Sequence, residues 1–156
     1  MYKPVEYYCN PQFFPQPDDI LCSNQFVVEE RIELPSHKPI IDKILESKVT
    51  AEIESYKLID TPRGKKVFVR GILEQKILYV VDSLCQPVHA FHSTFPFCEF
   101  MKLCECGSSF DILEVVKPKI IVEYMETIQL CPRSIRKCVL LFMWYPKGII
   151  TPPCPP

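Results

Sequence analysis

The sequence lacks the features that identify several large classes of protein. The longest strongly apolar stretch, residues 139–145, is strand-sized, whereas a membrane-spanning helix needs about 20 apolar residues. The 18 Lys and Arg residues are balanced by 19 Asp and Glu residues, which excludes the strongly basic character typical of nucleic-acid-binding proteins. The first residues contain no charged segment followed by an apolar one, so export by a signal peptide is not expected. We therefore expect no membrane span and no nucleic-acid partner.

Motifs of catalysis are missing as well. The sequence contains no G-x-S-x-G nucleophile motif, no phosphate-binding loop and no C-x-x-C pair. His89 and His92 are three residues apart on an expected strand, so their side chains point to opposite faces and make a poor chelating pair. Arg63, Lys65 and Lys66 fit a solvated turn, with phosphate binding as the alternative. We expect no enzyme activity and no cofactor.

Cysteine, by contrast, is abundant, with nine among 156 residues. This density is typical of disulfide-bonded secreted domains. A protein that is made in a reducing cytoplasm but forms disulfides must meet oxidant later, after cell lysis or after assembly outside the cell. Because nine is odd, at least one sulfur is free or bonded to another chain. The alternative is surface thiols that react only incidentally. The candidates for intermolecular disulfides are Cys9, Cys22, Cys104, Cys106 and Cys154.

A metal site is the main alternative for Cys98, Cys104 and Cys106. Their spacing, C-x5-C-x-C, departs from the C-x2-C or C-x4-C pairs of structural zinc sites, so no metal is expected. On an extended strand the Cα atoms of Cys104 and Cys106 are about 7 Å apart, at or beyond the usual disulfide limit. These two thiols would reach separate partners more readily than each other, unless both are simply buried or free.

The chain divides into three parts: an N-terminal arm (1–24), a β domain (25–146) and a proline-rich C-terminal tail (147–156). Four prolines in the arm remove amide donors and fix φ, which predicts an extended segment. The arm is also rich in aromatic residues, unlike typical disordered segments, and we expect it to dock on a protein surface. The docking candidates are Tyr7, Tyr8, Phe13 and Phe14.

Between the two tails, alternating apolar residues predict an all-β fold, an antiparallel β-sandwich or a barrel-like domain. Residues 61–64 predict a turn, and Gly71 predicts a bulge or a close backbone approach within a long strand. One short helix is predicted at residues 39–47, where four apolar side chains share a helical face. The expected strands are 25–34, 49–59, 66–81, 88–93, 98–104, 119–130 and 137–145.

The last expected strand is apolar on both faces. Either a helix or loop of the same chain covers its outer side, or that side is a contact face for a neighbouring subunit. The candidate subunit-contact residues are Leu140, Leu141, Phe142, Met143 and Trp144.

Four segments of the central region carry a family resemblance. They are Leu34-Pro35 followed by residues 38–45, residues 67–73, residues 76–81, and Phe95-Pro96-Phe97. In this order and spacing, residues 27–145 resemble the SPOCS domain of endospore-forming bacteria, which occurs in spore coat morphogenesis proteins and related sporulation proteins. The resemblance implies a β-rich, non-catalytic assembly module.

The chain departs from the coat adaptors of that family, because their LysM tail is not present and two short cysteine-bearing tails stand in its place. The arrangement is similar in architecture to spore appendage subunits, in which an N-terminal arm reaches into an earlier subunit. We therefore expect a structural self-assembling subunit of the spore surface, an appendage fibre or coat, made in the mother cell and joined by arm docking and disulfides. Its expected partner is itself, as a homopolymer, with other spore coat proteins as further partners. The alternative is a non-catalytic adaptor that binds another spore coat protein.

Overall fold

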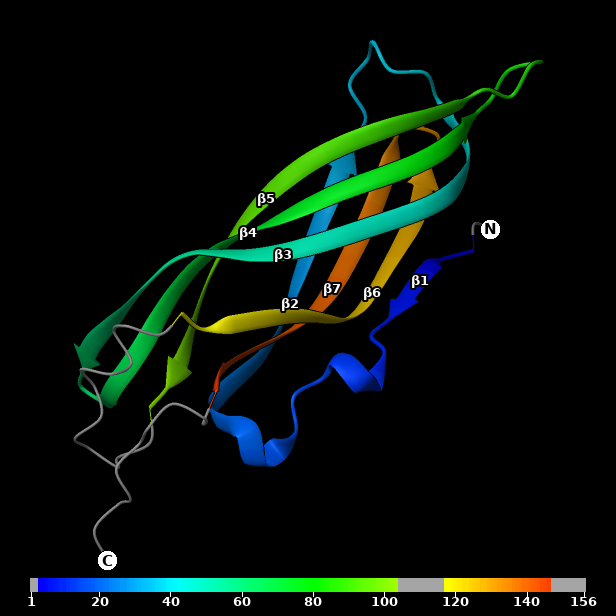
Figure 1. Cartoon of the computed structure of the whole chain (residues 1–156). Coiled ribbons are helices and arrows are strands. Elements are labelled where there is room, and N and C mark those ends of the chain that lie inside the picture. The colour runs from blue at the N-terminus through cyan, green and yellow to red at the C-terminus, as the bar shows by residue number, and fades with distance from the viewer. Residues whose placement is uncertain (1–2, 104–116, 147–156) are drawn as a thin grey trace, which may run out of the picture.

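The protein is a sandwich of two antiparallel β-sheets, which the computed structural model describes for residues 3–103 and 117–146 (Figure 1). The first sheet has four strands in the order β1-β6-β7-β2, and the second has three in the order β3-β4-β5. The described strands form two separate sheets and do not close into a barrel. The expected all-β fold is therefore confirmed in its sandwich form.

Seven strands and two single-turn 3-10 helices account for the described elements. In chain order they are β1 (Val5–Tyr8), η1 (Pro11–Phe13), η2 (Pro17–Asp19), β2 (Ile20–Glu33), β3 (Ile41–Thr61), β4 (Gly64–Val81), β5 (Val88–Lys102), β6 (Lys119–Cys131) and β7 (Ser134–Pro146). The expected boundary between arm and β domain at residue 24 falls inside β2, which begins at Ile20.

The core forms between the sheets because inward and outward side chains alternate along the strands. On β4, Val67, Val69 and Leu73 are buried, and they pack in one apolar cluster with Val139 and Leu141 of β7 in the other sheet. Burying a side chain of this size stabilises the fold by roughly 1.5–3 kcal/mol. The period-two pattern in the sequence therefore determines which face of each strand points inward.

The helix predicted at residues 39–47 is wrong, because residues 41–47 belong to β3. The register of β3 against β4 shifts between Ile41 and Lys43 and again between Ile44 and Glu46. Each bulge places two residues opposite one, so the inward side chains of Ile41, Ile44 and Ser47 recur at every third residue. A spacing of three is also the spacing of one helical face, which explains the error.

Two glycines have the roles that the sequence predicted. Gly64 begins β4 after the turn, with a φ of +103° that favours glycine. A Cβ atom at Gly71 would lie 2.5 Å from the carbonyl oxygen of Glu52 and 2.8 Å from Cε1 of Phe97. The close approach predicted at Gly71 is therefore confirmed, and β3 carries a bulge opposite it, next to Ile53.

The strand predicted at residues 88–93 and residues 98–102 of the next predicted strand belong to one strand, β5, which ends at Lys102; Cys104, the predicted end of the second strand, lies outside the described residues. Pro96 interrupts the sequence pattern but not the strand. It pairs with Ile72 on one side only, because β5 is the edge of its sheet. Proline is tolerated at an edge, where the missing amide donor faces no partner strand.

Candidate functional site

The part of the N-terminal arm that is described and precedes β2, residues 3–19, lies along the four-stranded sheet of its own chain (Figure 1). Its strand β1 pairs antiparallel with β6, and Tyr8 lies opposite Tyr124. The amide of Cys9 extends this pairing by donating to the carbonyl oxygen of Glu123 at 2.8 Å. The arm therefore forms one edge of the sheet before it passes through η1 and η2 into β2.

Aromatic contacts attach the arm at two points. The ring centroids of Tyr8 and Tyr124 are 5.0 Å apart, and those of Phe14 and Phe142 are 4.6 Å apart. Both distances lie in the range of favourable aromatic pairs, which contribute roughly 0.5–1.5 kcal/mol beyond their buried area. Two of the four docking candidates, Tyr8 and Phe14, thus contact the sheet of their own chain.

The other two docking candidates, Tyr7 and Phe13, are 45% and 73% exposed. Tyr8 is also exposed, at 68%, despite its contact with Tyr124. Phe13 ends η1, which Asn10 caps by accepting a hydrogen bond from the amide of Gln12 at 3.0 Å. Proline at position 11 fits the first helical position, where no amide donor is needed. The capped turn leaves Phe13 exposed to solvent and places Phe14 against Phe142 of the sheet.

Carboxylates accept hydrogen bonds from both tyrosines of the arm contact. Tyr8 donates to Glu6 at 3.1 Å, and Tyr124 donates to Glu126 at 3.0 Å. The hydrogen bond to Glu6 is the main reason why the pKa of Tyr8 is raised. Desolvation, followed by the hydrogen bond to Glu126, raises the pKa of Tyr124 to about 12. Both hydroxyls therefore remain protonated donors at neutral and mildly alkaline pH.

The predicted subunit-contact strand, β7, is an inner strand of its sheet, and its two faces have different surroundings. Leu141 and Met143 point into the core between the sheets and are fully buried. Leu140, Phe142 and Trp144 lie on the outer face, where Phe142 and Trp144 are still only 9% and 8% exposed. Within the single chain, the ring of Phe14 contacts this outer face at Phe142.

The predicted linking cysteines are spread over the molecule. Cys9 is half-buried at the end of β1, whereas Cys22 lies in the core at 7% exposure. Cys104, Cys106 and Cys154 lie outside the described residues.

Four further cysteines were not among the predicted links, and three of them are exposed. Cys85, Cys98 and Cys131 are exposed free thiols, and Cys138 is a half-buried one. Burial raises the pKa of the Cys138 thiol, and the nearby carboxylates of Glu29 and Glu126 raise it further. The sequence signal that could have found Cys85 and Cys131 is a nearby proline, because Pro87 follows Cys85 by two residues and Pro132 directly follows Cys131.

The other candidate sites of the sequence lie in ordinary surroundings. His89 stacks on Tyr79 with ring centroids 6.1 Å apart, and Lys65 lies 3.7 Å from Asp60 beside the β3–β4 turn. Within residues 3–103 and 117–146, no three His, Cys, Asp or Glu side chains are grouped so that they could hold a metal ion. The same ranges contain no helix with the length and apolar character needed to cross a membrane.

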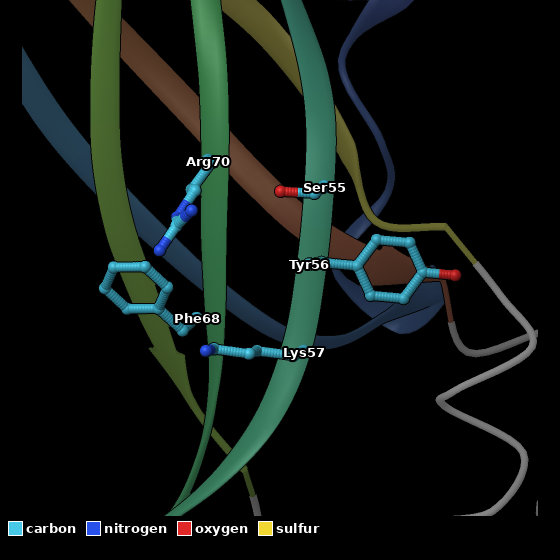
Figure 2. A pocket seen from close by; sticks show the side chains of 5 residues that line it. All are labelled: Ser55, Tyr56, Lys57, Phe68 and Arg70. Atoms are coloured by element: carbon cyan, nitrogen blue, oxygen red, sulfur yellow. The ribbon is translucent and has the colours of Figure 1, made fainter.

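A small hollow lies on the three-stranded sheet and has cationic side chains at its border (Figure 2). Its volume is about 120 Å³, and it is lined by Ser55, Tyr56, Lys57, Phe68 and Arg70. The Arg70 guanidinium lies 5.9 Å from the centroid of the Phe68 ring, a distance at which a cation and an aromatic face attract each other. The volume is below the roughly 300–1,000 Å³ of most small-molecule pockets.

One buried residue that sequence reasoning missed is Lys137. It lies on the inner face of β7, between Ile135 and Val139, and is 1% exposed. The available signal was the period of the strand, because Lys137 occupies the same face as Val139 and Leu141. A lysine on an apolar face of an inner strand is costly to bury and therefore marks a special environment.

Comparisons with known proteins identify one family. The family model "SipL, SPOCS domain" matches residues 40–129, more than half of the chain, from the residue before β3 to near the end of β6. Strands β1, β2 and β7 lie outside this match. No curated protein and no solved structure matched. The sandwich, the order of its motifs and the family match together show that the chain belongs to the SipL SPOCS-domain family and is a sporulation-related protein.

Proposed function

We propose that this protein is a structural self-assembling subunit of the endospore surface, in an appendage fibre or in the coat. Neighbouring subunits are joined by exchange of the N-terminal arm and by intermolecular disulfides. The observation that carries this proposal is the position of the arm, a terminal segment that forms a sheet edge and contacts an apolar outer face.

The arm can be exchanged because its contacts do not depend on which chain supplies it. Strand β1 has only four residues and pairs on one side only. If the arm leaves the sheet, the outer face of β7 at Phe142 loses its contact with the ring of Phe14. The arm of a second copy can restore the same contact. Domain swapping of this kind generates a ring when the rotation between subunits closes and a filament when it does not.

Disulfides would then make an exchanged arm permanent. Cys9 directly follows β1 and is half-buried, so an exchanged arm carries its thiol onto the neighbouring subunit. A covalent link makes a reversible contact effectively intramolecular, which raises its effective concentration and slows dissociation. The exposed thiols of Cys85, Cys98 and Cys131 are the acceptors that another chain can reach among the described residues. The buried Cys22 could be reached only after β2 opened locally.

The first experiment is removal of the arm at the boundary that the structure gives. A chain that begins at Ile20 keeps β2 complete, whereas deletion to residue 24 would remove part of that strand. The expected product is a folded monomer that does not polymerise under oxidising conditions, while the full chain forms reducible oligomers on a denaturing gel. A truncated chain that still polymerises contradicts the proposal.

A second variant keeps the arm but fixes it to its own chain. Glu6 and Glu126 are opposite each other in the β1–β6 pair, where Cα atoms are about 4.5–5.5 Å apart, within the range of a disulfide. The double substitution Glu6→Cys with Glu126→Cys, in a Cys9→Ser background, should block assembly when oxidised and permit it when reduced. A chain that stays monomeric in every state, with Cys9→Ser having no effect on partner binding, favours the adaptor function instead.

A further inference from the structure

A belt of polar side chains crosses the interior of the sandwich. In the four-stranded sheet, Lys137 of β7 is flanked by Glu30 of β2 and Thr127 of β6. In the opposite sheet, Gln75 of β4 is flanked by Ser93 of β5. The belt separates two apolar clusters, one containing Leu73 and Val139 and the other containing Ile77 and Ile135.

Among the described residues, every buried side-chain nitrogen or oxygen atom that lacks a hydrogen bond belongs to this belt. These atoms are Lys137 Nζ, Gln75 Oε1 and Ser93 Oγ. Lys137 is 1% exposed and Gln75 is 4% exposed, so bulk solvent does not reach these side chains. An unpaired buried polar group destabilises the folded state, because it loses its hydrogen bonds to water without replacement. Three such groups in one place are unusual, because most buried polar groups are paired.

Glu30 connects two other polar side chains of this belt. The amide nitrogen of Gln75 donates a hydrogen bond to the carboxylate of Glu30, although the two residues belong to opposite sheets. Glu30 and Lys137 are directly opposite each other on neighbouring strands and both point inward, so their Cβ atoms are about 4.5–5.5 Å apart. The Glu30 carboxylate thus has two neighbours: the amide of Gln75, which donates a hydrogen bond to it, and Lys137, which lies opposite it on the adjacent strand.

The state of the amine fits a nucleophile. Desolvation lowers the pKa of Lys137 from 10.5 to about 7, and the charge of Glu30 opposes this effect only in part. In a large fraction of the molecules the Lys137 amine is therefore neutral near pH 7, and its nitrogen has a lone pair. Lysines depressed in this way serve as nucleophiles in other proteins.

We propose that Lys137 and Gln75 form an intramolecular isopeptide bond that joins β7 of one sheet to β4 of the other. The Nζ lone pair of Lys137 attacks Cδ of Gln75, a new Cδ–Nζ amide bond forms, and the Cδ–Nε2 bond breaks. Glu30 accepts a proton from the attacking nitrogen and passes it to the leaving nitrogen, to which it is already hydrogen-bonded. Ammonia leaves, so atoms and charge balance and no oxidant is required.

The bond would be a covalent tie between the two layers that reducing agents do not break. It is independent of the arm and of the cysteines, so it goes beyond the proposed assembly function and does not rest on it. It also removes the cost of burying an amine, because the product is a neutral amide.

The test is the intact mass of the purified full-length chain after complete reduction and alkylation of its cysteines. The expected mass is lower than the sequence mass by one molecule of ammonia. Peptide mapping should find a branched peptide that joins the segment around Gln75 to the segment around Lys137. A folded chain with the full sequence mass and two separate linear peptides overturns the proposal.

Matched variants assign the loss of ammonia to this site. Lys137→Met and Glu30→Gln should each show the full mass, the first because the nucleophile is gone and the second because proton transfer is lost. Lys48→Met, which removes an exposed lysine paired with Glu46, should keep the lower mass. A lower mass that persists in Lys137→Met comes from another residue and also overturns the proposal. The mapping of the wild-type chain decides the question even if a variant does not fold.

Discussion

Replacing Phe14 by alanine should loosen the N-terminal arm while leaving the sandwich folded. Phe14 is half-buried, and its ring lies 4.6 Å from that of Phe142. Phe13 provides the matched control, because it is the preceding residue, has the same side chain and is 73% exposed. The two variants therefore differ only in whether the lost ring contacts the sheet.

The expected magnitude follows from the two parts of this contact. Full burial of a phenylalanine contributes roughly 1.5–3 kcal/mol, so a half-buried one contributes about 1 kcal/mol. The aromatic pair adds about 1 kcal/mol. A total of about 2 kcal/mol corresponds to an increase of about 30-fold in the fraction of chains whose arm is detached.

Two measurements follow arm release directly. Hydrogen exchange of the β1 amides should accelerate by about 30-fold in Phe14→Ala. Emission from Trp144, the one tryptophan of the chain, should shift to longer wavelength, because Trp144 stacks on Phe142 with centroids 5.6 Å apart. If Phe14→Ala exchanges at the wild-type rate, or if Phe13→Ala accelerates exchange equally, the described arm contact does not hold the arm in place.

Three further predictions concern the β domain. Gly71→Ala should lower the free energy of unfolding by about 1–3 kcal/mol or more, measured by urea denaturation, because the added Cβ meets the Phe97 ring; an unchanged midpoint would contradict the close approach. Alkylation of Cys138 should require higher pH than alkylation of the exposed cysteines, because burial raises its thiol pKa. The same dependence of alkylation rate on pH at Cys138 and at the exposed cysteines would contradict this. In a Gln75→Leu chain, which cannot form the isopeptide bond, stability should rise by up to about 5 kcal/mol between pH 7 and 10.5. The unfolded chain binds the Lys137 proton in that window and the folded chain does not, so adding Lys137→Met should remove this slope.

The sequence alone predicted the features that depend on neighbours along the chain. Alternation at a period of two fixes which face of a strand is apolar, and this gave the all-β class and the strands that became β4, β6 and β7. The turn ending at Gly64 and the close approach at Gly71 were also predictable, because glycine is favoured where φ is positive or where a Cβ has no space. The order of four short motifs gave the family.

The tertiary structure decided the features that depend on a partner strand. Bulges arise from the pairing of β3 with β4, so a spacing of three at residues 41–47 could not be distinguished from one turn of a helix. The sequence also left open what covers the outer face of β7, since Phe14 and Phe142 are far apart in the chain and meet only in the fold. The same holds for Glu30, Gln75 and Lys137, which come from strands of both sheets. Local patterns determine strands, but only long-range pairing determines which side chains share a buried site.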